Sequence, residues 1–417
     1  MSQEVLRSIS AVVDRYFSRV LKLAEEMISV PTVNPPGLNY EELAELVANE
    51  MDGLGLEVSV HEAPHEEAGE GGSKRLNVLG KLAFSLEGPS IHFHGHYDVV
   101  PASGGWSTEP FRPVMRDGKL YGRGASDMKA ALAASVYVPV LAREAAEEFG
   151  LGLRGEALVS ATPDEETGGQ AGAGYLVEEG IVRGVDYTIV PEPTFLTYIW
   201  HVQKGCLWLK VILRGREAHG SIPHLGLNAF EKMAELALRL VEYDRALRSK
   251  VSKTPAYPEG ANRASLAIGG MCGSGEAVNV VPGTAWFTID RRVLPEESTR
   301  EAEEAVMAVI KAFERDNPGV EVRVEELLRI EPSGIPADHE LVGMVKKALS
   351  DVLDLEGKPV LCPGFLNTRY FVAKGMPAVA WGPGDLEQAH SPDEHIELLK
   401  LRDWLKAAVY LVLESLR

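Results

Sequence analysis

Histidine and carboxylate side chains gather in five short segments of this 417-residue chain, and the first reads Ile91-His-Phe-His-Gly-His-Tyr-Asp98. Alternate residues of a strand share a face, so His96 and Asp98 should point the same way. A carboxylate beside an imidazole fixes the tautomer of the ring and raises its basicity. We therefore predict that His96 binds a metal ion and that Asp98 orients it. His92 and His94 lie deeper in the strand, and we expect them to be buried and hydrogen-bonded.

Three further segments place carboxylates where a predicted strand ends: Gly122-Arg-Gly-Ala-Ser-Asp127-Met-Lys, Thr162-Pro-Asp-Glu165-Glu166-Thr-Gly-Gly169 and Val190-Pro-Glu192-Pro-Thr194. Each has a plainer alternative. Asp127 precedes a predicted helix and would suit its cap, and the glycines after Glu166 suit a solvated turn. Prolines on both sides of Glu192 make a stiff backbone, which suits an exposed turn as well as a metal ligand. Consecutive carboxylates repel each other, and a cation beside Glu165 and Glu166 would relieve that repulsion. One of these two would bind metal and the other act as a base.

The fifth segment, Gln388-Ala-His390-Ser-Pro-Asp-Glu-His395, supplies a second imidazole, although Pro392 also suits an ordinary polar loop. His395, at the edge of the next predicted element, is the less suitable ligand. If Asp127 bridges two ions, each ion has one histidine, one terminal glutamate and one oxygen of Asp127. Positions then stay open for water or substrate, as catalysis requires. Imidazole and carboxylate ligands suit Zn²⁺, for which Co²⁺ or Mn²⁺ can substitute.

The elements that must position these residues divide the chain into three stretches. Strands and helices alternate over 1–202, which predicts a mostly parallel sheet with helices on both faces. Residues 203–329 instead follow the order β-α-β-β-α-β of a ferredoxin-like unit. The first pattern resumes over 330–417. We predict an α/β protein with a discontinuous catalytic domain (1–202 and 330–417) and an inserted second domain (203–329). Sites in such sheets form at the carboxyl ends of strands, where distant segments can converge.

Composition limits the class of partner. A net charge of −19 and a pI near 5.1 argue against a nucleic-acid partner and against an anionic membrane surface. The sequence contains no apolar stretch of ~18 residues that could span a membrane, and no secretory signal is visible at its start. Its three cysteines are far apart and form no paired motif. We expect a cytoplasmic protein.

Together, the five segments resemble those of one metallohydrolase family, in order and in spacing along nearly the whole chain. This dinuclear-zinc family of metallopeptidases and deacylases contains acetylornithine deacetylase, succinyl-diaminopimelate desuccinylase, aminoacylase and the glutamate carboxypeptidases. The resemblance implies a zinc-peptidase-like catalytic domain holding two Zn²⁺ per chain. It also implies that the inserted ferredoxin-like domain is a lid through which the protein forms a homodimer.

The resemblance also implies a role for each residue of the metal centre. His96 and Glu192 would bind one ion, and Glu166 and His390 the other. Asp127 would bridge them and be followed by a cis peptide bond to Met128. Glu165 would be the general base.

Four residues elsewhere resemble contacts that the family makes with its substrates. His219, in Arg216-Glu-Ala-His219-Gly-Ser-Ile-Pro, resembles a lid histidine that reaches a neighbouring active site and steadies the oxyanion. Asn279, Arg292 and Arg369 resemble contacts to the substrate carboxylate, and Arg291 could exchange roles with Arg292. The family often has Asp at the position of Asn367, so this corner of the pocket departs from its pattern.

The expected activity is hydrolysis of the amide bond of an N-acyl amino acid, by a water between the two ions and a glutamate base. One alternative is a dipeptidase or carboxypeptidase with the same metal centre, acting on short peptides. Another is a binding paralogue without catalysis, which should have lost a ligand or the base. All five ligand residues and Glu165 are present.

Overall fold

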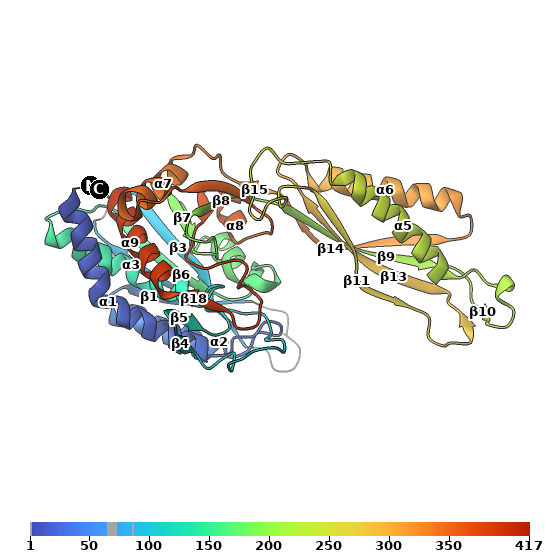
Figure 1. Ribbon diagram of the computed structural model, residues 1–417, viewed down its shortest axis with the longest axis horizontal. Coiled ribbons are helices and arrows are strands. Elements are labelled where there is room, and N and C mark those ends of the chain that lie inside the picture. The colour runs from blue at the N-terminus through green and yellow to red at the C-terminus, as the bar shows by residue number, and fades with distance from the viewer. Residues whose placement is uncertain (1, 65–72, 86) are drawn as a thin grey trace. The chain divides into compact units, whose positions relative to one another are not determined.

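The computed structural model describes residues 2–64, 73–85 and 87–417, which fall into two compact units (Figure 1). Unit 1 comprises Met1–His201, Gly334–Pro359 and Leu366–Arg417. Unit 2 comprises Val202–Ser333 and Val360–Phe365. The short segment Val360–Phe365 thus packs with unit 2, although it lies within the stretch 330–417.

A mixed sheet forms the centre of unit 1, in the strand order β1-β2-β6-β3-β7-β17-β8-β15, with β16 paired to β8. Its inner strands are parallel, since β3 pairs with β6 and β7, and β7 pairs with β17. At one edge β1, β2 and β6 pair antiparallel. The strands are β1 Glu57–Ala63, β2 Arg75–Ala83, β3 Ser90–His96, β6 Glu156–Thr162, β7 Tyr187–Val190, β8 Tyr198–Gln203, β15 Ser333–Gly334, β16 Lys358–Cys362 and β17 Ala378–Ala380.

Helix α3 lies at the heart of the helical layer, packed against α1, α9 and the strands β3 and β6 (Figure 1). It is rich in alanine, and every residue from Lys129 to Ala142 is buried, as expected for a helix enclosed on all sides. The helices of unit 1 are α1 Gln3–Ser29, α2 Tyr40–Gly53, α3 Lys129–Glu148, α4 Tyr175–Glu178, α7 Glu340–Leu353, α8 Thr368–Ala373 and α9 Leu398–Ser415. Among the described helices, none combines the length and apolar composition that a membrane crossing requires.

A small antiparallel sheet, β18-β5-β4, ties the C-terminal part of the chain to the segment before Asp127. Its strands are β4 Val114–Arg116, β5 Lys119–Tyr121 and β18 His395–Glu397. Sequence analysis predicted a strand just before Gly122, which is β5, but it did not predict β4 or β18. They matter because they place the loop that contains His390 beside the loop that contains Asp127.

Unit 2 has the predicted ferredoxin-like order β9-α5-β11-β13-α6-β14, and its antiparallel sheet runs β11-β13-β9-β14. Alternate residues of β9, such as Leu207, Leu209 and Val211, are buried in a core that the two helices share. A separate two-stranded ribbon pairs β10 with β12. The elements are β9 Gly205–Arg214, β10 Ala218–His219, α5 Ala229–Leu247, β11 Ser265–Ser274, β12 Val280–Val281, β13 Thr284–Val293, α6 Thr299–Asp316 and β14 Glu321–Ile330.

Candidate active site

The candidate residues of unit 1 meet at the carboxyl ends of three neighbouring parallel strands. His96 is the last residue of β3. Glu165 and Glu166 begin the short 3₁₀ turn η1 (Glu165–Thr167) that follows β6. Glu192 lies two residues beyond the end of β7. Because these strands run the same way, their ends share one edge of the sheet, as such folds require of a site.

Asp127 reaches the same place from the loop before α3. The residue that caps this helix is Met128, with no side-chain hydrogen bond, so the alternative of Asp127 as the helix cap is wrong. The peptide bond between Asp127 and Met128 is cis, as the family resemblance implied. One carboxylate oxygen of Asp127 lies 3.2 Å from Nε2 of His96, and the other lies 3.5 Å from Nε2 of His390.

Two overlapping groups of metal-ligating atoms result. His96, Asp127 and Glu192 form one group, and Asp127, Glu166 and His390 form the other, each with its atoms within 4.8 Å of one another. Nε2 of His390 lies 3.1 Å from Oε1 of Glu166. Asp127 belongs to both groups. Nitrogen and oxygen donors at these separations fit two divalent cations that share a carboxylate.

The electrostatics of the centre favour a cation. Burial raises the pKa of Glu165 to about 8, and repulsion from Glu166, Asp127 and Asp98 adds to this. Burial and the neighbouring carboxylates likewise hold the pKa of Glu192 well above its usual range. Oε1 of Glu192 is buried and has no hydrogen-bond partner among the described residues. Buried carboxylates of this kind are stable as anions only beside positive charge, so the residues present fit a metal centre.

Asp98 connects the imidazole of His96 to the turn that carries the two glutamates. Its carboxylate accepts hydrogen bonds from the backbone N–H groups of Glu165 (3.1 Å) and Glu166 (3.2 Å). It also accepts from Nδ2 of Asn34 at 2.9 Å. Nδ1 of His96 lies 3.0 Å from the backbone oxygen of Asp98 and 3.4 Å from Oδ1. One buried carboxylate therefore orients a candidate ligand and the candidate base together.

His92 and His94 are buried and hydrogen-bonded, as the sequence predicted. Nε2 of His92 and Nδ1 of His94 each lie 2.8 Å from Oγ of Ser160. Nδ2 of Asn367 lies 3.0 Å from Nε2 of His94. Burial lowers the pKa of His92 to about 3, so the ring is neutral. Both rings belong to the core beneath the site, and Asn367 extends this buried chain of polar groups.

His219 and Asn279 come together on the surface of unit 2. His219 is the last residue of β10 and pairs with Val280 of β12. The N–H of Gly220 donates to the backbone oxygen of Asn279 at 2.7 Å. His219 is exposed, and its Nδ1 lies 2.8 Å from Oγ of Ser221. Nδ1 is thus engaged with a neighbouring side chain, whereas no such contact is seen for Nε2 among the described residues.

The two adjacent arginines of β13 have different surroundings. Arg291 is fully buried, and it donates to Oε2 of Glu297 at 2.7 Å. Arg292 is partly exposed, forms a 2.9 Å ion pair with Asp290 and lies over the ring of Phe365 at 5.7 Å. Arg292 is therefore the more accessible of the two guanidinium groups.

Arg369, in unit 1, donates to backbone oxygens. Its guanidinium bonds the carbonyl of Leu366 at 2.7 Å and the carbonyl of Gly168, just beyond the turn η1. It also lies 4.4 Å from the centre of the Tyr370 ring. These contacts brace the glutamate turn, and a substrate carboxylate would compete with them for the guanidinium.

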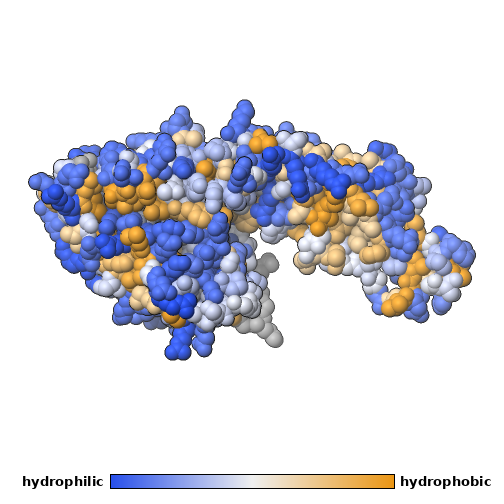
Figure 2. All heavy atoms as spheres, viewed as in Figure 1, coloured by the Kyte–Doolittle hydropathy of each residue, from blue (hydrophilic) through white to orange (hydrophobic). Residues whose placement is uncertain are grey.

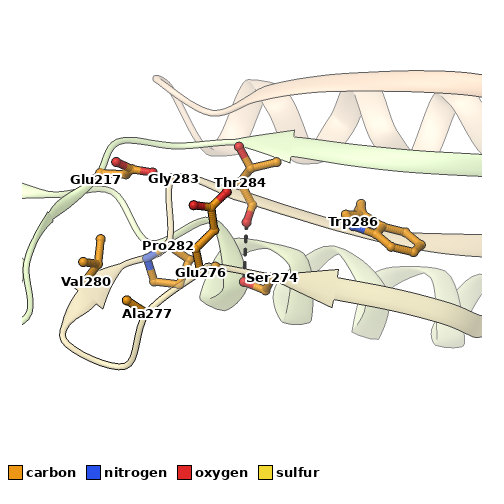
Figure 3. A pocket seen from close by; sticks show the side chains of 10 residues that line it. Glu217, Ser274, Glu276, Ala277, Val280, Pro282, Gly283, Thr284 and Trp286 are labelled. Carbon is orange, nitrogen blue, oxygen red and sulfur yellow. Dashed lines mark hydrogen bonds between the residues drawn. The ribbon is translucent and has the colours of Figure 1, made fainter.

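A pocket of about 360 Å³ opens on unit 2, between the ends of β11 and β13 (Figure 3). Glu217 and Glu276 contribute carboxylates to its wall, and Trp286 and Pro282 contribute apolar surface. Ser274 bonds the backbone oxygen of Thr284 at 3.5 Å across it. None of the candidate ligands lines this pocket, and its carboxylates would repel an anionic substrate.

Sequence reasoning assigned no role to several residues that hold the centre in place. Asp164 is buried and accepts hydrogen bonds from Nε of Arg75 (2.7 Å) and from the hydroxyl of Tyr40 (2.9 Å). Nδ2 of Asn34 bonds Asp98 and lies 3.3 Å from Asp164. Asp164 stands directly before Glu165, which is a sequence signal, but its partners Asn34 and Arg75 lie about 90 to 130 positions away.

Comparison with known proteins agrees with this geometry. A model of peptidase family M20/M25/M40 matches residues 92–415. The succinyl-diaminopimelate desuccinylase of Paracidovorax citrulli is 31% identical, over 91% of this chain and 93% of its own. The acetylornithine deacetylase of Photorhabdus laumondii is 28% identical, over 91% and 92% respectively. The structure of human carnosine dipeptidase 1 matches with a TM-score of 0.77 at 18% identity, over 99% of this chain and 98% of that one, which shows a shared fold.

The chain belongs to peptidase family M20/M25/M40, because the family model spans most of its length. Its α/β fold with a mixed sheet is the fold of that family. As a member of the family it is a metal-dependent hydrolase that acts on amide bonds. The resemblance found in the sequence is thereby confirmed at the level of family, fold and reaction class.

Proposed function

We propose that this chain hydrolyses the amide bond of an N-acyl amino acid at a centre of two Zn²⁺ ions. His96 and Glu192 hold one ion, Glu166 and His390 hold the other, and Asp127 bridges them. The observation that carries this proposal is the pair of ligand groups that share Asp127. Co²⁺ or Mn²⁺ can replace Zn²⁺, because the donors are imidazole and carboxylate alone.

Glu165 acts as the general base in this proposal. When bound, the ions would polarise the amide carbonyl and lower the pKa of a water molecule to ~7. Glu165 takes the proton of the attacking water and delivers it to the nitrogen of the leaving amine. Its backbone N–H is bonded to Asp98, which holds in place the backbone from which this carboxylate extends.

Residues of unit 2 bind the reacting molecule in this proposal. His219 reaches the active site of a neighbouring copy, where it donates a hydrogen bond to the amide oxygen as that oxygen becomes negatively charged, an interaction of the kind worth ~2.7–4 kcal/mol. Arg292 presents a guanidinium to the substrate carboxylate, and charge-assisted pairs of this kind are strong and directional. Asn279, next to the His219 ribbon, is a further contact.

Acylated amino acids are favoured over peptides as substrates because of the sequence relatives. The relatives similar over nine-tenths of the chain include a deacetylase and a desuccinylase of amino acids. The dipeptidase matches at only 18% identity, so this match indicates a shared fold and says nothing about the substrate. Among the described residues no disulfide joins any of the three cysteines, which suits the reducing cytoplasm that we propose as the location.

We also propose that two copies of the chain associate through unit 2. Phe230, Leu238 and Val241 form an exposed apolar stripe on α5, at 50%, 67% and 36% exposure. Apolar atoms are visible at the surface of unit 2 in Figure 2. Strand β11 is an edge of the sheet and exposes Met271. An apolar stripe beside a free sheet edge is typical of an association surface. Leu238→Glu should convert a dimer to a monomer in analytical ultracentrifugation.

The test is hydrolysis of a small panel by protein that has been stripped with a chelator and then reloaded. The panel holds N-acetyl-ornithine, N-succinyl-diaminopimelate, other N-acyl amino acids and dipeptides. Activity should be lost on chelation and restored by Zn²⁺ or Co²⁺, with an N-acyl amino acid cleaved fastest. Faster cleavage of a dipeptide would replace the proposed substrate class, and activity that survives complete removal of metal would contradict the proposed centre.

A further inference from the structure

The Asp127 loop and the His390 loop are joined by one buried carboxylate, that of Glu394. Its Oε1 accepts hydrogen bonds from the backbone N–H groups of Ser126 (2.9 Å) and Asp127 (3.0 Å). Its backbone oxygen accepts from the N–H of Gly122 at 2.9 Å. Glu394 is 0% exposed, although it lies only four residues from the exposed His390.

The second oxygen of Glu394 is held by an equally buried arginine. Nη1 of Arg123 donates to Oε2 at 2.6 Å, and Arg123 is 1% exposed. The same nitrogen lies 3.4 Å from the backbone oxygen of Ser391. The guanidinium also lies 5.2 Å from the ring of Trp106. Both oxygens of the carboxylate therefore have partners on the Asp127 loop. Arg123 also contacts the backbone of Ser391, the residue after His390.

We propose that Glu394 is a positioning residue that sets the separation between Asp127 and His390, and with it the affinity of the second metal position. This inference rests on the proposed metal centre. Asp127 is also held through the start of α3, where the N–H of Lys129 bonds the oxygen of Gly124 at 2.8 Å. The exposed His390 depends more on the Glu394 contacts. Loss of these contacts should therefore weaken metal binding at the Asp127–Glu166–His390 group and leave metal binding at the group that contains His96 unchanged.

The test must separate this role from the stability of a buried ion pair. Removing Glu394 alone would leave the Arg123 charge buried and unpaired, which destabilises a protein whatever its function. Two double variants avoid this problem, because both carry Arg123→Met. Glu394→Gln keeps a carbonyl oxygen for the N–H groups of Ser126 and Asp127, whereas Glu394→Met has a similar length and no such acceptor.

Each protein is stripped of metal, titrated calorimetrically with Zn²⁺ and checked with Co²⁺ by absorption. In Arg123→Met/Glu394→Met the Kd of the second ion should rise ~10–100-fold, the range found for residues that orient metal ligands. The Kd of the first ion should stay within about threefold of wild type. Arg123→Met/Glu394→Gln should bind both ions within about threefold of wild type. Tyr137→Phe in α3, which removes a hydrogen bond to Glu50 of α2, serves as a control for altered stability.

Single Glu394→Gln extends the test to a protein that keeps Arg123. Its NH₂ group must face either Arg123 or the two backbone N–H groups, so the Kd of the second ion should rise and should fall again when Arg123→Met is added. The role of Glu394 would be overturned if the two double variants, with Gln or Met at position 394, had the same Kd for the second ion. It would also be overturned if the Kd rose equally for both ions. Failure of the wild-type protein to bind two ions would overturn the metal centre itself, and that result is seen before any variant is made.

Discussion

The two units hold their candidate functional residues in opposite ways. In unit 1, His96 and Glu192 are 1% and 4% exposed, and Asp98 beneath them is fully buried. Hydrogen bonds from Asn34 and from two backbone N–H groups fix the Asp98 carboxylate. In unit 2, His219 and Asn279 are exposed; His219 lies on a two-stranded ribbon outside the main sheet, and Asn279 lies in the turn directly before the second strand of that ribbon.

This difference indicates which functions depend on folding and which on contact with another molecule. Several carboxylates buried together are stable as anions only where the fold supplies donors and a cation. Substitutions of the candidate ligands in unit 1 should therefore change metal content and stability together. The exposed residues of unit 2 are stabilised by water, so their substitution should change turnover or substrate affinity and leave the folded state intact.

Glu165→Gln should have the largest effect on turnover. The neutral amide has no proton-accepting carboxylate, so kcat should fall ~10²–10⁴-fold, the usual contribution of a general base. Metal content should stay at the wild-type value, because Glu165 is outside both ligand groups. Glu166→Gln is the matched control one residue along, and it should lower metal occupancy measured by mass spectrometry. Near wild-type kcat in Glu165→Gln would remove Glu165 from the mechanism.

His219→Ala should lower kcat ~10²–10³-fold, as expected for loss of one donor to a developing oxyanion. Metal content and melting temperature should not change, because the side chain is exposed. His224→Ala, a second exposed histidine of unit 2, is the control and should keep full activity. An equal effect of the two substitutions would show that His219 has no special role.

Arg292→Met and Arg291→Met should give opposite phenotypes. Loss of the partly exposed Arg292 should raise KM ~10–100-fold, the equivalent of one hydrogen bond to a charged group, with little change in stability. Loss of the buried Arg291 should leave Glu297 without one of its cations and destabilise unit 2 by ~3 kcal/mol. Urea unfolding and steady-state kinetics measure the two quantities. The reverse pattern would exchange the roles of the two residues.

The smallest expected effect is a dependence of stability on pH confined to unit 1. Burial lowers the pKa of His92 from 6.5 to about 3, so its contribution to stability is present above pH 6.5 and is lost as the pH falls. Between pH 7 and pH 5 this loss should be ~2 kcal/mol. His92→Gln should be less stable at pH 7 and show a smaller decrease on acidification, measured by urea unfolding.

Unit 2 supplies the internal control for this pH dependence. Its histidines, His219 and His224, are both exposed, so acidification to pH 5 should not destabilise it through buried imidazoles. Intrinsic fluorescence of tryptophans that belong to one unit can follow the two units separately. A pH dependence that is unchanged by His92→Gln would assign the effect to the carboxylates of the metal centre.

The sequence alone was sufficient for the order of the main helices and strands and for the choice of candidate ligands. Helix α3 begins at Lys129, as its apolar pattern predicts. His96, Glu165 and Glu192 lie at strand ends because alternation and strand length are local properties that the sequence records. These features require no knowledge of which strands are neighbours, and the family resemblance then supplied the pairing of ligands with ions.

Only the tertiary structure decided which distant groups meet. Glu394 has the local pattern of a loop residue, and nothing near it in the sequence indicates that it bonds the backbone of Asp127, 267 positions away. Arg291 and Arg292 are adjacent and chemically identical, yet the face of β13 on which each lies makes one a buried support and the other a partly exposed cation. Local pattern determines which element a residue joins, whereas burial and charge pairing depend on partners that only the folded chain brings together.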